Sequence, residues 1–212
     1  MIRATLIATM ACVMSSSAAQ SNIAALPGDA VAGRSQAEWS VLWWQWAGSF
    51  EYDNSPVADR TGNLCHLKQK GPVWFLAGTY GTHRTVRTCK VPKGKYLFFP
   101  LINYVVSPDG VHPCSECCPN YVRTAREITD NPSYLIVDLD GQRLQQPESY
   151  RQVSPGCFDL GALSNPRYRV FPSAADGYYV MLKPLAPGKH VLNFGGQLPS
   201  MSQAVTYTLY VE

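Results

Sequence analysis

Apolar positions repeat with a helical period near the start of the chain. The residues at i, i+3, i+4 and i+7 are Trp39, Leu42, Trp43 and Trp46, which places them on one face of an α-helix. Ser35 and Glu38 have the spacing of a capping box, in which each side chain satisfies the other's backbone N–H. We therefore predict a helix over residues 35–48, with this tryptophan face buried and Trp44 off it.

Several later segments have the short apolar or alternating pattern of β-strands. They are residues 73–77, 96–106, 134–139, 177–183, 190–194 and 205–211. The long segment 96–106 contains Pro100, which predicts a bend or bulge within that strand. Shorter strands are expected near 150–153 and 168–171, and residues 78–90 are expected to form a loop or hairpin.

Turn residues connect these segments. Asp140-Gly141 is a favoured dipeptide for a two-residue hairpin. Residues 186–189 read Ala-Pro-Gly-Lys, which matches a type II turn and predicts that 190–194 returns beside 177–183. A short helix is expected over residues 121–130. The fold class is mainly β: a β-sandwich with one N-terminal Trp-rich amphipathic helix packed on it, forming a single domain over residues 20–212.

The first 19 residues have the features of a secretory signal peptide. Arg3 is followed by a short apolar stretch and then by the small residues of 15–19, with cleavage expected after Ala19. The apolar stretch is too short to span a membrane, and no second such segment follows. We therefore predict a secreted or periplasmic protein of bacterial type with no transmembrane segment after signal cleavage.

Cysteine usage agrees with export. Cleavage would remove Cys12 and leave an even number of cysteines, which in an exported chain indicates disulfides. The remaining six are Cys65, Cys89, Cys114, Cys117, Cys118 and Cys157. We expect Cys65 to pair with Cys89. We expect Cys157 to pair with Cys117 or Cys118, and Cys114 to pair with the one left over.

The same segment allows a metal-binding alternative. Cys114 and Cys117 have the spacing of metal ligands, and His112 and Cys118 stand beside them. Disulfide formation is the favoured interpretation, because the compartment is oxidising and no second ligand pair follows. No metal or other cofactor is predicted.

Three segments resemble a family of uncharacterised exported bacterial proteins. Their sequences are WxxxWWxW at 39–46, GPVWFLAGT at 71–79 and FFPLIN at 98–103. The resemblance spans roughly residues 35–105 and 134–211, and it implies no known activity. The cysteine-rich stretch 112–118 is not expected in the family.

Two sets of residues are candidates for function. Trp44 is the candidate for an exposed aromatic contact. Gln69 stands two residues before the segment 71–79, and Asn103 ends the segment 98–103. We predict these three residues to bind the ligand. His66, Asp59 and Arg87 form a second, polar set that could serve a dispersed hydrolase site.

Charge and motifs narrow the function classes. Loss of Arg3 with the signal leaves 17 basic and 15 acidic residues, and no basic stripe is present, so nucleic acid is not an expected partner. Signatures of serine hydrolases, metalloproteases and nucleotide-binding proteins are missing. We therefore predict a disulfide-stabilised, non-enzymatic binding module for a glycan, a surface component or a protein outside the cell. The alternatives are the secreted hydrolase and the metal-binding protein.

Overall fold

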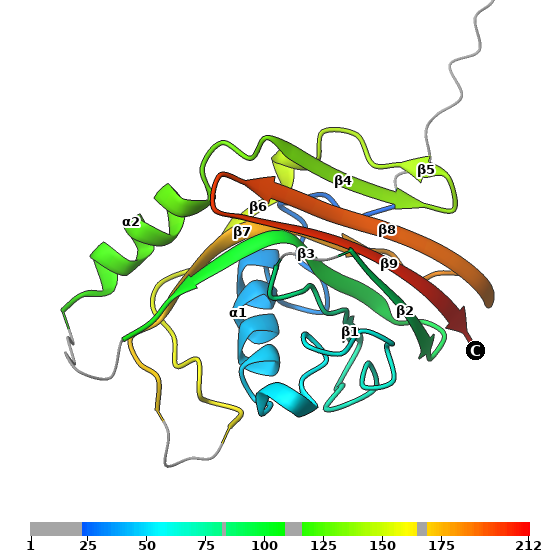
Figure 1. The fold of residues 1–212 in the computed structure, drawn as a ribbon, viewed down its shortest axis with the longest axis horizontal. Coiled ribbons are helices and arrows are strands. Elements are labelled where there is room, and N and C mark those ends of the chain that lie inside the picture. Colours follow the sequence, from blue (N-terminus) through cyan, green and yellow to red (C-terminus); the bar gives the residue numbers. More distant parts are fainter. Residues whose placement is uncertain (1–22, 82–83, 109–115, 165–168) are drawn as a thin grey trace, which may run out of the picture.

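The computed structural model describes residues 23–81, 84–108, 116–164 and 169–212. These residues form two stacked β-sheets, with helix α1 (Gln36–Ala47) against one of them and helix α2 (Cys118–Thr129) at one end (Figure 1). The four-stranded sheet has the order β1 (Val73–Phe75), β3 (Tyr96–Val106), β7 (Ala174–Leu182), β6 (Arg151–Val153). The five-stranded sheet has the order β2 (Arg84–Val91), β9 (Met201–Val211), β8 (Gly188–Leu198), β4 (Tyr134–Leu139), β5 (Gln142–Arg143). The predicted mainly β, disulfide-bonded sandwich with its Trp-rich helix is confirmed.

Both sheets mix parallel and antiparallel pairs. β1 runs parallel to β3, and β2 runs parallel to β9, whereas the other pairs are antiparallel. The register of β3 against β7 shifts between Pro100 and Ile102, which confirms the predicted irregularity. Asp140 and Gly141 both have positive φ, at 53° and 82°, as a type I′ turn requires.

Two sequence predictions about pairing were wrong. Residues 84–91 form the regular strand β2 instead of a loop or hairpin. The segments before and after the expected turn at 186–189 do not pair with each other, because β7 lies in the four-stranded sheet and β8 in the five-stranded sheet. Residues 183–187, with a bend at 187 instead of the expected type II turn, carry the chain from one layer to the other, and β8 forms its hairpin with β9. Residues 169–171 are not in a strand.

Helix α1 begins as predicted. The hydroxyl of Ser35 accepts from the backbone N–H of Glu38, and the Glu38 carboxylate accepts from the N–H of Ser35. Trp39, Trp43 and Trp46 are buried against Phe98, Tyr179 and Met181 of the sheet. A second core lies between the two sheets, where the ring centroids of Phe99 and Phe194 are 4.4 Å apart at an interplanar angle of 37°.

Helix α2 is fixed to the four-stranded sheet by a buried carboxylate. Asp176 on β7 accepts hydrogen bonds from the Thr129 hydroxyl at 2.6 Å and from Arg151 Nε at 2.9 Å. Arg151 also forms an ion pair with Asp130, which ends the helix. Burial raises the pKa of Asp176, and the bonds from Thr129 and Arg151 oppose that rise. The helix begins at Cys118, three residues before the predicted segment.

Two disulfides connect segments outside the sheets to other parts of the fold. Cys65 bonds to Cys89, and Cys118 bonds to Cys157, so both predictions that concern described residues are confirmed. Cys117 is disulfide-bonded as well, whereas Cys114, its expected partner, lies outside the described residues. The predicted signal peptide also lies outside them.

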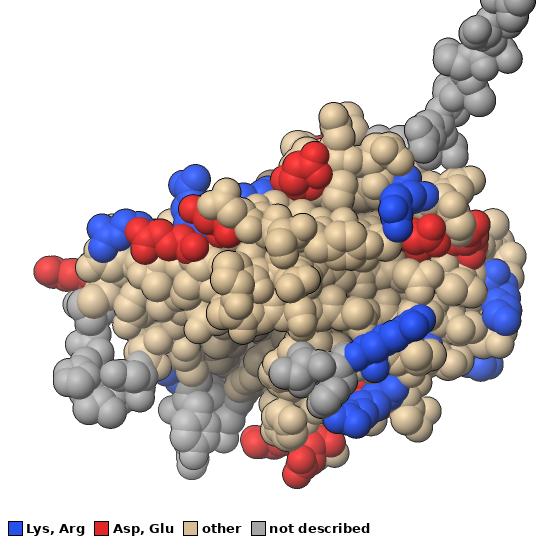
Figure 2. All heavy atoms as spheres, turned by 45° about the horizontal axis from the view of Figure 1, so that its top comes forward, with Lys and Arg blue, Asp and Glu red and all other residues tan. Residues whose placement is uncertain are grey.

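The two outer faces of the sandwich differ. The connection from β6 to β7 crosses over α1, where Gln45 donates to the backbone oxygen of Asp159. On the five-stranded sheet, the outward positions in the middle of β8 and β9 are uncharged: Val191, Asn193, Gly195, Ala204, Thr206 and Thr208. Charged residues, Arg84 of β2 and Asp138 of β4, stand at the ends of these rows. Figure 2 shows this broad area free of charged side chains, with charges around it. No helix of the described residues is long and apolar enough to cross a membrane.

Candidate functional site

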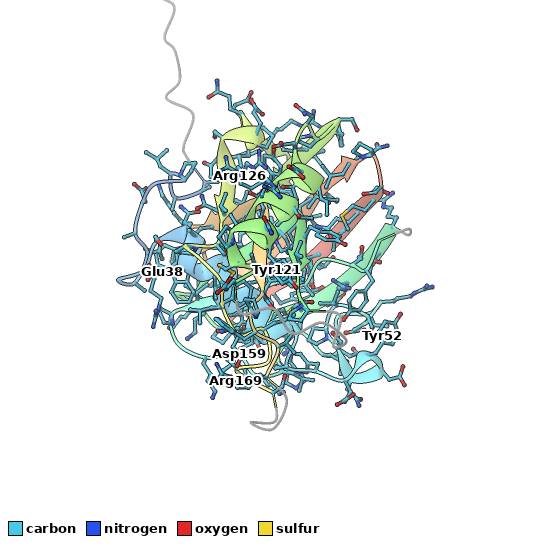
Figure 3. All side chains as sticks on the ribbon, turned by 90° about the vertical axis from the view of Figure 1, so that its left-hand side faces the viewer. Glu38, Tyr52, Tyr121, Arg126, Asp159 and Arg169 are labelled. Carbon is cyan, nitrogen blue, oxygen red and sulfur yellow. A yellow bond between two sulfur atoms is a disulfide. The ribbon has the colours of Figure 1, made fainter. Side chains whose placement is uncertain are left out.

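Two tyrosines form a stacked, solvent-exposed pair on the loops beside β2. Tyr52 begins the 3-10 helix η1 (Tyr52–Asn54), and Tyr80 lies between β1 and β2. Their ring centroids are 5.2 Å apart at an interplanar angle of 23°, and the residues are 65% and 58% exposed. Figure 3 shows Tyr52 at the rim of the molecule. Exposed aromatic rings held against each other present flat apolar faces to solvent, as binding surfaces do.

Arg87 lies beneath the loops that carry this pair. It points inward from β2 and is only 1% exposed. Its Nε donates to the backbone oxygen of Asp59 at 2.6 Å, and its Nη2 donates to that of Val57 at 3.0 Å. Both acceptors belong to the loop that follows Tyr52.

The other guanidinium nitrogen serves the second loop. Nη1 of Arg87 donates to the backbone oxygens of Ala77 and Gly78, at 2.6 and 2.9 Å, and to the hydroxyl of Tyr207 at 3.1 Å. These carbonyls lie just before Tyr80. Of the five acceptors around this guanidinium, three lie at Nη1, one at Nη2 and one at Nε. Arg87 therefore holds the two tyrosine loops together, and its burial keeps the guanidinium away from the solvent side of the loops.

The groups around the Arg87 guanidinium are compatible with its buried charge. Burial raises the pKa of Tyr207, while the charge and hydrogen bond of Arg87 oppose that rise, so the phenol stays neutral. A buried charge is tolerated only when its hydrogen bonds are satisfied. Carbonyl dipoles and one hydroxyl provide that satisfaction here without a carboxylate.

Asp59 organises its own turn. Its carboxylate accepts from Thr61 N and Oγ1 at 2.7 Å and from Leu64 N at 2.8 Å. Partial burial favours the neutral form, but these backbone hydrogen bonds outweigh it and lower the pKa of Asp59. The carboxylate is thus ionised, and its hydrogen bonds stabilise the loop that carries it. This indicates a structural role for Asp59.

The loop is also fastened along β2. The Cys65–Cys89 disulfide crosses from it to the strand, and Thr88 N donates to Thr61 O at 2.8 Å. Gly62 has φ +89°, and a Cβ there would meet the oxygen of Thr88 at 2.3 Å. Only glycine fits both the backbone conformation and this close approach. The loop therefore covers the edge of the five-stranded sheet.

Gln69 has a structural task next to this loop. Its side-chain oxygen accepts from Phe75 N, and its Nε2 donates to Phe75 O and Cys65 O, all at 2.9 Å. The amide thus pairs with the outer edge of β1 as a neighbouring strand would. His66 is exposed. Arg87 and Asp59 are engaged by backbone groups, so the geometry does not favour the hydrolase interpretation at this set.

Trp44 and Asn103, which were both predicted to bind the ligand, contact the same buried hydroxyl group. Trp44 Nε1 and Asn103 Nδ2 both donate to the hydroxyl of Tyr179, at 2.8 and 3.1 Å. Tyr179 is fully buried, and burial raises its pKa above the usual range. Trp44 is half-buried and packs edge-on against Trp43. This cluster links α1 to β3 and β7, and Gln69 is not part of it.

The predicted metal ligands are placed only in part. Cys117 and Cys118 are both disulfide-bonded, so neither has a thiolate to offer a metal. His112 and Cys114 lie outside the described residues. Within the part of the chain that the structure describes, no group of three or more His, Cys, Asp or Glu side chains could hold a metal ion.

Sequence reasoning missed the tyrosine pair. Tyr52 and Tyr80 lie in polar, turn-rich segments far apart in the chain, and neither has a periodic apolar neighbour. One sequence signal could have indicated the loops that carry it. Exposed and buried residues alternate along β2, and Arg87 is on the same side as Cys89 and Val91. A charged residue at a buried strand position indicates an anchor for nearby loops.

Comparisons with known proteins do not identify a family for this chain. No protein-family profile matches the chain, and no curated protein matches it significantly. A solved structure entitled "Structure of PbICP-C in complex with falcipain-2" aligns with 67% of this chain and 100% of its own. The TM-score is 0.30 and the identity is 11%.

Proposed function

We propose that this protein is an exported, non-enzymatic binding module that recognises a neutral glycan through Tyr52 and Tyr80. The observation that carries the proposal is the stacked pair, whose two rings are both exposed to solvent. The C–H groups of a sugar ring carry partial positive charge and stack on the electron-rich face of an aromatic ring.

Rigidity supports a binding role. Arg87 and the Cys65–Cys89 disulfide fix the loops on either side of the pair, so little conformational entropy is lost when a ligand binds. Tyrosine itself has few rotatable bonds and a hydroxyl that can donate to a ligand. The site is thus ready-made for stacking.

The polar neighbours favour a neutral sugar. Glu51, Asp53 and Asn54 are exposed around Tyr52, and neither acid is in an ion pair with another described residue. Their oxygens can accept hydrogen bonds from sugar hydroxyls, whereas they would repel the carboxylates or sulfates of an acidic polysaccharide. Export to an oxidising compartment, which the disulfides support, would bring the module to such glycans.

A glycan array and immobilised polysaccharides test the proposal. We expect wild-type protein to bind neutral glycans, and Tyr52→Ala and Tyr80→Ala each to weaken binding about threefold to tenfold through the loss of one aromatic contact. Tyr134→Ala is the matched control, because Tyr134 is 51% exposed on β4. The proposal is wrong if no neutral glycan binds, or if the two site variants bind as well as the control does.

A further inference from the structure

A separate cavity lies between the outward face of α1 and residues 155–158. Its volume is about 280 Å³. The residues that line it are Arg34, Glu38, Val41, Leu42, Pro155, Gly156, Cys157 and Phe158. Figure 3 shows Glu38 and Tyr52 at opposite edges of the molecule, so this cavity does not belong to the tyrosine pair.

The cavity has a mainly apolar floor. Glu38, Val41 and Leu42 follow at i, i+3 and i+4, so they share a side of α1, and Leu42 also packs against the tryptophan core. Val41 and Leu42 are half-buried. Leu42 was predicted to share the buried tryptophan face, and the structure turns it partly toward this cavity.

The opposite wall is held in place. Cys157 is bonded to Cys118 of α2, and Phe158 exchanges two backbone hydrogen bonds with Ser173, at 2.8 and 2.9 Å. Both sides of the cavity are therefore fixed to regular structure. Such a cavity is preformed, as small-molecule sites generally are.

Two opposite charges stand at the cavity. Hydrogen bonds from Ser35 and, to a smaller extent, the charge of Arg34 lower the pKa of Glu38, but no ion pair joins Arg34 to Glu38 among the described residues. Glu38 Oε2 accepts from Ser35 N and Ser35 Oγ, both at 2.8 Å. This keeps the carboxylate at the start of the helix and leaves Oε1 without a partner among the described residues. The side chain of Arg34 forms no hydrogen bond or ion pair within the same part of the chain.

We propose that this cavity binds a free α-amino acid with an aliphatic or aromatic side chain. Arg34 would bind the carboxylate of the ligand, and Glu38 would bind its ammonium group. The side chain would lie against Val41, Leu42 and Phe158. The charge pattern is complementary to a zwitterion, and the volume is just below the roughly 300 Å³ at which pockets for drug-sized ligands begin.

Calorimetric titration with free L-leucine tests the inference. We expect saturable binding, and at least about tenfold weaker binding of glycine, because it buries no apolar side chain. Arg34→Gln should weaken leucine binding about tenfold or more through loss of the charge-assisted bond. Arg143→Gln is the control, because Arg143 is an exposed arginine on β5, and its leucine affinity should equal that of the wild type.

A second variant separates the two charges. Glu38→Gln keeps the capping box, because glutamine also serves at this position, but it removes the negative charge. It should weaken binding of leucine and leave binding of N-acetyl-leucine, which has no ammonium group, unchanged. Absence of saturable leucine binding, or leucine affinities unaffected by Arg34→Gln or by Glu38→Gln, would overturn the inference without affecting the glycan proposal.

Discussion

Arg87 and Tyr207 are register partners in the parallel β2–β9 pair, and Arg87 Nη1 donates to the Tyr207 hydroxyl at 3.1 Å. The guanidinium also lies 5.6 Å from the centroid of the Tyr207 ring. One side-chain pair therefore joins two strands of the sheet, and through Ala77 O it joins them to the segment that leads to Tyr80. The exposed site depends on a contact that is entirely buried.

Replacement of Arg87 should destabilise the fold strongly. Arg87→Met leaves several buried carbonyl oxygens without donors, and each unsatisfied group costs about 1–3 kcal/mol. We expect the free energy of unfolding in urea to fall by at least about 3 kcal/mol. Arg84→Met, an exposed position on the same strand, should change it by less than about 0.5 kcal/mol. Equal effects at the two positions would contradict the anchoring role.

The two described disulfides should both contribute to stability, but only Cys65–Cys89 should contribute to glycan binding. Replacing Cys65 and Cys89 by alanine should lower the free energy of unfolding by about 3 kcal/mol and weaken glycan binding, because the Tyr52 loop loses its attachment to β2. Replacing Cys118 and Cys157 should lower stability by a similar amount while glycan binding is retained in the folded fraction. A loss of binding in both pairs, measured on the same glycan array, would show that the first disulfide has no special link to the site.

Gly177 should not accept a side chain. It lies in β7 opposite Asn103, and a Cβ there would meet the Asn103 Cβ at 2.5 Å. Gly177→Ala should therefore reduce the free energy of unfolding by about 1–3 kcal/mol. Gly28→Ala has open space around the new Cβ, so its midpoint of thermal unfolding should stay close to the wild-type value. A neutral Gly177→Ala variant would show that β3 and β7 separate easily.

Stability should depend on pH through His190. Its Nδ1 lies 2.6 Å from Asp140 Oδ2, and its Nε2 lies 2.9 Å from Ala186 O. Burial disfavours the charged ring, but these hydrogen bonds outweigh burial and raise the pKa of His190 above 6.5. The folded state thus binds the proton more tightly than the unfolded chain, so this stabilisation is complete below about pH 6.5 and is lost as pH rises through the folded pKa.

Urea unfolding at pH 5.5 and pH 8.5 measures this effect. The advantage of wild type over His190→Gln should be larger at pH 5.5 than at pH 8.5, and Asp140→Asn should reduce the difference. If the free energy of unfolding changes with pH by the same amount in wild type and His190→Gln, a contribution from His190 is excluded, because other titrating residues affect both proteins equally.

Local sequence signals predicted the elements that depend on neighbouring residues. The capping box of Ser35 and Glu38, the turn at Asp140-Gly141 and the irregularity at Pro100 all appear as expected, because each involves a few adjacent positions. The Cys65–Cys89 disulfide was also predicted correctly. The tryptophan face is buried as its helical spacing indicated.

Predictions that depended on distant partners were less successful. A type II turn was expected at residues 186–189, but the structure has only a bend at 187 and begins β8 at Gly188. Turn residues do not determine which sheet receives the next strand, so the pairing of β7 with β8 was also wrong. Arg87 was recognised as a polar candidate, yet its role comes from carbonyl oxygens in two separate loops. Tyr52 and Tyr80 lie on loops that are joined through this guanidinium and, for the Tyr52 loop, also through the Cys65–Cys89 disulfide.

The position of β9 between β2 and β8 has a consequence for the order of folding. The β8–β9 hairpin can form early because its strands are adjacent in sequence, but β2 must wait for β9 to arrive from far along the chain. Closing such a long segment is entropically costly and slows assembly. The two aromatic loops can reach their final positions only after this late strand has docked, so ligand recognition would be acquired at the last stage of maturation.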